Sequence, residues 1–163
     1  MAKNRPLTFK EAKIKAAAYC AYQERTQQEV RSKLYDIGLY GDEIEELIAE
    51  LISENFINEE RFAKAYAGGK FRMNHWGRLK IQAGLQAKGL SKRCIETGLG
   101  EIDDEAYEEK IDVLIRKKAA TIKEADEIKT KYKIANYLIN KGFEPPITWD
   151  KVNAYFANPK VSS

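Results

Sequence analysis

The chain has 163 residues, of which 44% are hydrophobic and 33% are charged, and its net charge is +3 at neutral pH. This composition is too apolar for a disordered chain and is typical of a folded, helix-rich protein. No apolar run approaches the roughly 20 residues that a membrane-spanning helix needs, and the polar, basic segment 1–6 is not followed by the apolar core of a signal peptide. We therefore expect a cytoplasmic protein with no membrane segment.

Cysteine and histidine, which often carry catalysis or bind metals, are sparse. Cys20 and Cys94 lie inside helical patterns, which favours two free thiols in a reducing compartment. His75 is the only histidine, so a structural zinc site is not expected, and we interpret it as a solvated turn residue. Gly68-Gly69 lacks the ending of a phosphate-binding loop, and the chain has no nucleophile elbow. The sequence therefore predicts no enzyme, no cofactor and no metal site.

Three helices are predicted in the first third of the chain. The first runs from Thr8, which forms a capping box with Glu11, to about residue 24. Its expected buried residues are Phe9, Ile14, Ala17, Ala18 and Ala21. A second capping box at 26–29 starts the next helix, and a third helix begins near Asp42. The apolar face of that third helix is predicted to be Ile44, Leu47, Ile48, Leu51 and Ile52.

The remaining helices follow the same plan. Asn58 is the expected cap of a helix that ends at the break 75–77, and Ser91 caps a short helix after the one containing Ile81 and Leu85. Further helices are predicted near 103–119 and 122–140. After Pro145-Pro146, Thr148 is the expected cap of the last helix.

A pattern of apolar residues and glycine occurs three times, at spacings of 51 and 53 residues. An apolar pair four residues apart is followed, four residues later, by a glycine and then by another apolar residue. The members are Val30, Leu34, Gly38 and Leu39; Ile81, Leu85, Gly89 and Leu90; and Ile134, Leu138, Gly142 and Phe143. The pair faces inward from a helix that the glycine ends as a left-handed C-cap.

We therefore predict an all-α protein of three tandem three-helix repeats that resemble helix-turn-helix units and form an elongated, curved array. The expected units are 1–57 with an N-terminal extension, 58–102, and 103–163 with a C-terminal tail. Nothing in the sequence indicates self-association, and we expect a monomer.

The middle third of the chain is basic, with nine lysines and arginines and no carboxylate from Arg61 to Ile95. Cations interleaved with aromatic residues suit a polyanionic strand or an acidic protein surface. Alternatively, the aromatic residues are core and the lysines form a solvated face. The candidate contact residues are Lys64, Lys70, Arg72, Trp76, Arg78, Lys80, Lys88, Lys92 and Arg93. Sequence-specific reading of duplex DNA has little support, because the helices from Asp42 and Ser91 lack suitable side chains for base edges.

Several segments together resemble the RecX family. These are Arg25–Leu34 with Gly38-Leu39, Phe56–Tyr66, and Trp76–Ile81 with Leu85 and Lys88–Leu90. The resemblance is clear over about residues 12–100 and weaker through the third unit. Gly68-Gly69 and Gly84 depart from it, since helix-favouring residues are usual there, and they are expected to loosen or break their helices.

The resemblance implies a non-enzymatic regulator of the RecA recombinase in DNA repair and recombination. Such a protein binds in the groove of the RecA filament on single-stranded DNA and limits filament growth, strand exchange and ATP hydrolysis. The partners it implies are the RecA filament and, through the basic middle repeat, single-stranded DNA. Trp76 is either a contact residue or part of a buried turn with Gly77. The alternative function is a nucleic-acid-binding helical module that does not need RecA.

Overall fold

The computed structural model describes residues 7–158, so segments 1–6 and 159–163, which include the ends of the expected extension and tail, lie outside it. Within this range the chain forms helices and no strand. The helices are α1 (Phe9–Tyr22), α2 (Gln27–Asp36), α3 (Asp42–Ser53), α4 (Glu59–Asn74), α5 (Arg78–Ala87), α6 (Lys92–Leu99), α7 (Asp104–Ala119), α8 (Glu127–Asn140) and α9 (Pro145–Ala157). The all-α fold is confirmed.

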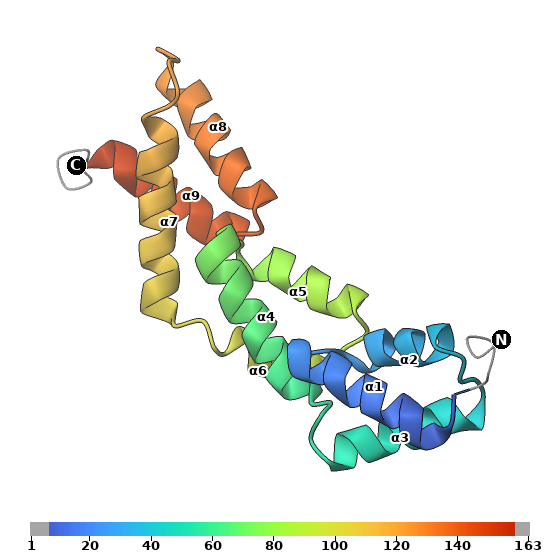
Figure 1. Cartoon of the computed structure of the whole chain (residues 1–163). Coiled ribbons are helices and arrows are strands. Elements are labelled where there is room, and N and C mark those ends of the chain that lie inside the picture. Colours follow the sequence, from blue (N-terminus) through green and yellow to red (C-terminus); the bar gives the residue numbers. More distant parts are fainter. Residues whose placement is uncertain (1–6, 159–163) are drawn as a thin grey trace.

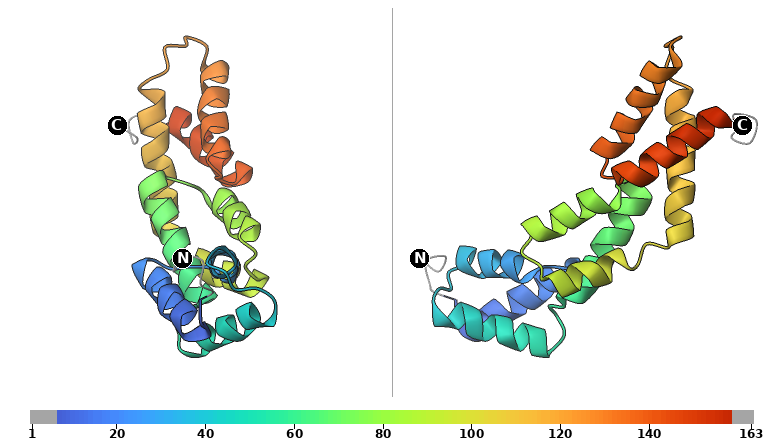
Figure 2. Two further views of the ribbon diagram at one scale, coloured as in Figure 1. Left: turned by 45° about the vertical axis from the view of Figure 1, so that its right-hand side comes forward. Right: turned by 180° about the vertical axis from the view of Figure 1, so that it is seen from behind.

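The helices pack in consecutive groups of three. The more extensive helix–helix contacts all fall within α1–α3, within α4–α6 or within α7–α9. Figure 1 shows the groups following one another in an elongated, curved array, and the second helix of each group (α2, α5 and α8) lies on the inner side of the curve in Figures 1 and 2. We call the groups the first, second and third repeats.

The repeated apolar pattern has the predicted structural role in each group. The inward pairs are completely buried in α2, α5 and α8. Gly38, Gly89 and Gly142 all have positive φ, between 81° and 109°, which glycine adopts without a side-chain penalty. In each copy the N–H of the residue after the glycine donates to the carbonyl of the last inward residue, as from Phe143 to Leu138 at 3.2 Å. These bonds close the helix ends as the spacing predicts.

Side-chain caps start several helices where the sequence placed them. Thr8, Thr26, Asn58 and Ser91 each accept a hydrogen bond from the backbone N–H three residues on. The predicted start of the last helix is wrong. Helix α9 begins at Pro145, because two prolines fit the first turn of a helix, where their missing N–H groups need no partner. Thr148 is therefore buried within α9 instead of capping it. Helix α8 begins at Glu127, later than predicted, and is capped by Asp126.

The predicted buried face of α1 is wrong apart from Phe9, which is partly buried and packs against the core of the first repeat. Ala12, Ala16 and Cys20 are buried, whereas Ile14 is 63% exposed. The helix is rich in alanine and offers two apolar stripes, and the small-residue stripe is the one that packs against α2 and α3. In α3 the predicted face is correct except for Ile52, which is 43% exposed. Gly68-Gly69 and Gly84 do not break their helices, since α4 and α5 continue through them.

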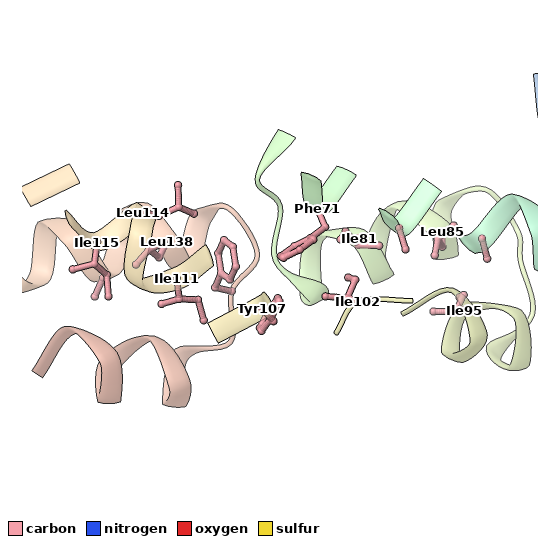
Figure 3. Packing of buried hydrophobic residues seen from close by; sticks show 14 of the residues in the cluster. Phe71, Ile81, Leu85, Ile95, Ile102, Tyr107, Ile111, Leu114, Ile115 and Leu138 are labelled. Carbon is pink, nitrogen blue, oxygen red and sulfur yellow. The ribbon is translucent and has the colours of Figure 1, made fainter. Parts of the chain in front are cut away.

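The buried residues form two separate cores. One belongs to the first repeat and extends from Ala12 to Ile57. The other runs without interruption through the second and third repeats, and Figure 3 shows Phe71 and Tyr107 between Leu85 on one side and Leu138 on the other. The second and third repeats are thus joined by apolar packing, whereas the first has a core of its own.

No helix within residues 7–158 is both long enough and apolar enough to cross a membrane. The same range contains no group of histidine, cysteine and acidic side chains that could hold a metal ion, and both cysteines are free thiols.

Candidate interaction site at the joint between the second and third repeats

The break between α4 and α5 is where the third repeat docks. The N–H of Gly77 donates to the carbonyl of Lys141 at 2.7 Å, and the N–H of Leu79 donates to the carbonyl of Gly142 at 2.9 Å. A Cβ atom on Gly77 would collide with the backbone of Gly142 and Phe143. Glycine is therefore required at position 77 because two backbones meet there. The turn that ends α8 and the start of α5 form one joint.

Arg78 is held inside this joint. Its guanidinium pairs with Asp104 at 2.6 Å and Glu144 at 3.6 Å, and it lies 3.8 Å from the ring centroid of Tyr107. The backbone N–H of Arg78 donates to the Tyr107 hydroxyl at 3.0 Å, and that hydroxyl donates to Glu144. Burial, followed by the bond to Glu144, raises the pKa of Tyr107 well above its usual range. These contacts tie the second repeat to the third, so the cation of Arg78 is engaged within the chain.

Trp76 is half-buried, so its ring lies partly in the core and partly at the surface, and its role as a contact residue stays a prediction. Its ring packs against the core and makes an edge-to-face contact with Tyr66, with ring centroids 6.4 Å apart. The ammonium groups of Lys70 and Lys80 lie 4.8 and 4.6 Å from the Trp76 ring centroid. Neither lysine pairs with a carboxylate of the described residues. We call Tyr66, Lys70, Trp76 and Lys80 the Trp76 cluster.

Tyr66 reaches this position because α5 carries a glycine opposite it. A Cβ on Gly84 would collide with the Tyr66 hydroxyl, so the ring lies against bare backbone. Gly84, which departs from the family pattern, is therefore explained by packing. The absence of a side chain there lets the Tyr66 ring lie close to α5.

The other predicted contact residues are dispersed. Lys64 lies 4.0 Å from Glu101, and Lys88 pairs with Glu29 of the first repeat at 3.1 Å. Arg72, Lys92 and Arg93 are exposed. The last two begin α6, which packs near the N-terminal end of α4 (Figure 1). The structure thus gathers Lys70, Trp76 and Lys80 from the predicted set.

His75 is a functional candidate that the sequence interpretation missed, and its assignment as a solvated turn residue is wrong. It ends α4 in the left-handed conformation, with φ 57° and ψ 42°. The half-buried ring places Nδ1 2.8 Å from the Lys110 ammonium. Burial, then Lys110, Lys141 and Lys117, lower the pKa of His75. A histidine before Trp-Gly indicates a left-handed helix end, since histidine tolerates positive φ better than most residues. The contact with Lys110 could not be predicted in this way, because Lys110 is remote in sequence.

The structure defines a helical repeat protein, in which three-helix units stack into a curved array with a cationic, aromatic cluster at one joint. Two family models match it: residues 12–51 fit "RecX, first three-helix domain" and residues 58–99 fit "RecX, second three-helix domain". The chain belongs to the RecX family.

Relatives and solved structures agree with this membership. The regulatory protein RecX of Chlorobium limicola is 28% identical over 89% of this chain and 92% of its own length. That of Clostridium acetobutylicum is 30% identical over 86% of this chain, but only 65% of its own length is matched. The crystal structure of RecX from Lactobacillus salivarius superposes with a TM-score of 0.82 at 28% identity, over 90% of this chain and 94% of that one. Against several relatives, such as that of Bacillus mycoides, the match spans about half of the relative's length.

Proposed function

We propose that this chain is a non-catalytic regulator that inhibits the RecA recombinase by lying in the groove of the RecA filament on single-stranded DNA. As a cytoplasmic monomer in DNA repair and recombination, it limits filament growth, strand exchange and ATP hydrolysis. Membership of a family whose members are named regulatory proteins supports this role.

The observation that carries the proposal is the Trp76 cluster. The cations of Lys70 and Lys80 rest on an aromatic face, and no carboxylate within residues 7–158 neutralises them. Such a surface suits the acidic side chains or phosphates of a partner. The curved array supports the proposal as well, because a series of stacked repeats presents a long surface to a groove.

Charge reversal in the cluster tests the proposal. We expect the Lys70→Glu, Lys80→Glu double variant to inhibit the ATPase of filamentous RecA at least about tenfold more weakly than the wild type at low salt, because paired cations steer association electrostatically. The difference should shrink as salt screens the charges. The matched control is Lys129→Glu in α8, an exposed lysine outside the cluster. A correctly folded double variant that inhibits like the wild type would contradict the assignment.

The basic middle repeat also favours a second candidate function, a helical module that binds nucleic acid without RecA. Under that function, free single-stranded DNA would bind the chain tightly, and inhibition would vanish when RecA saturates the DNA. Inhibition that persists on saturated DNA, with weak binding to free DNA, supports the RecA regulator.

A further inference from the structure

A cavity of about 320 Å³ lies between the C-terminal end of α4 and helix α7, next to His75. Its apolar wall includes Phe71 and Leu114, and its polar lining includes His75, Lys110 and Lys117. It contains residues of both the second and third repeats, and it is separate from the Trp76 cluster, with which it shares no residue.

The polar lining carries positive charge that the described part of the chain does not neutralise. Lys110 is half-buried, its ammonium lies 5.1 Å from the Phe71 ring centroid, and it pairs with no carboxylate of the described residues. Burial, together with Lys117, lowers the pKa of Lys110. The one carboxylate among the lining residues, Glu109, is exposed and pairs with no cation within residues 7–158. A half-buried cation without a counter-ion favours the binding of an anion beside it.

When no anion is bound, the hydrogen bond between Lys110 and His75 sets the protonation state of the His75 imidazole. Lys110 is a donor only, so Nδ1 of His75 must accept, and the imidazole is then neutral with its proton on Nε2. Protonation at Nδ1 would place two cations 2.8 Å apart. An anion in the cavity would remove this conflict, because both groups could then donate to it.

We propose that this cavity binds a phosphate group, either free phosphate or a phosphodiester of a nucleic acid, through Lys110, Lys117 and the protonated form of His75. Phosphate oxygens accept hydrogen bonds from all three groups, and a negative charge beside an imidazole favours its protonation. The proposal is independent of the proposed action on RecA, since no partner protein takes part in it.

The proposal predicts that binding takes up a proton at His75. The charged groups that face this imidazole are Lys110 and Lys117 of α7, Lys141 after α8, and the cavity carboxylate Glu109. Burial and the charges of these three lysines keep the pKa of free His75 below its usual 6.5. The bound anion raises that pKa, so affinity increases as the pH falls through the interval between the free and bound values.

The test uses the single histidine of the chain as its own reporter. The imidazole proton resonances of the full chain are followed against pH in chloride alone, with inorganic phosphate, and with a short oligothymidylate, all at equal ionic strength. We expect a phosphate group to raise the pKa of His75 by about 1, the effect of a nearby opposite charge. A rise with both probes indicates a general phosphate site, and a rise with the oligothymidylate alone indicates a nucleic-acid phosphodiester. No rise with either probe overturns the proposal.

Two variants and one control substitution make the result specific. Lys110→Gln should lose most of the rise, while Lys129→Gln on α8 should keep it. His75→Asn preserves the left-handed helix end, since asparagine tolerates it, and should make oligothymidylate binding several-fold less dependent on pH. An unchanged rise in Lys110→Gln would overturn the assignment, and because the wild-type titration stands alone, the conclusion does not depend on either variant folding.

Discussion

Gly77 and Gly142 contact each other backbone to backbone, so the turn that ends α8 also positions the first turn of α5. This contact gives the Trp76-Gly77 segment a structural role. It is a docking point between repeats, and it fixes the neighbouring Trp76 with its outer surface available to solvent and to the two lysines beside it.

Replacing Gly77 with alanine should destabilise the protein by about 1–3 kcal/mol, the usual cost of overpacking. Gly77 has φ −82°, which alanine adopts freely, so the loss would be steric. The measurement is the urea midpoint followed by circular dichroism. The matched control is Gly69→Ala in α4, where the new methyl group meets nothing within 4 Å and should stabilise the helix by about 0.5–1 kcal/mol. Equal effects of the two variants on the urea midpoint would contradict the close backbone contact at Gly77.

Neutralising Arg78 should lower the stability of the fold, whereas neutralising Lys80 should weaken partner binding. Arg78→Gln removes the pairs with Asp104 and Glu144 and should lower stability by about 1–2 kcal/mol, discounted for the exposure of Asp104. Lys80→Gln should leave stability within about 0.5 kcal/mol, as surface changes usually do, and weaken partner binding. Unfolding and filament-binding curves of both variants check this. An Arg78→Gln protein that keeps its stability but no longer binds the filament would contradict the assignment of Arg78 to the joint.

Tyr107 should make stability fall at high pH. Its pKa is raised above the ordinary value of 10.0, so the folded state holds its proton more tightly than the unfolded chain does. The resulting stabilisation is fully present below pH 10 and is lost as the pH rises above it. Tyr107→Phe removes the buried hydroxyl and leaves Glu144 without that donor, which should cost about 1–3 kcal/mol at neutral pH. The difference in unfolding free energy between the two proteins should narrow above pH 10. A constant difference would argue against the raised pKa.

The first repeat should be the more loosely attached unit. Its core is separate from that of the second repeat, and the ion pairs Glu24–Arg61 and Glu29–Lys88 cross the joint between them. Each of these partly exposed pairs contributes about 1 kcal/mol or less. We expect the Glu24→Gln, Glu29→Gln variant, or high salt, to broaden the distribution of overall dimensions in small-angle X-ray scattering while helical circular dichroism stays unchanged. A compact, unaltered scattering profile would indicate a rigid joint.

The helices, their ends and their tandem grouping could be predicted from the sequence, while the side-chain contacts between residues far apart in the chain could not. The glycine helix ends at 38, 89 and 142 follow from residues within one turn, so the pattern identified them. The face of α1 was misassigned because an alanine-rich helix offers two stripes, and only its neighbours select one. The cations of the middle repeat were predicted as one set, but their partners, such as Glu144 for Arg78, lie far along the chain and became evident only in the structure.

The boundaries at residues 57/58 and 102/103 remain predictions. The continuous core from Phe62 to Val152 suggests that a fragment ending at residue 102 would expose apolar surface of the second repeat. A fragment containing residues 58–158 is therefore the shorter piece expected to fold, since it retains that core.

The most direct measurement of the central claim is ATP hydrolysis by RecA on single-stranded DNA as the chain is titrated in. We predict inhibition at well below one molecule per RecA protomer, because a protein lying along the groove or blocking growth affects many protomers at once. Absence of inhibition at stoichiometric amounts, with the helical fold confirmed by circular dichroism, would contradict the proposed function.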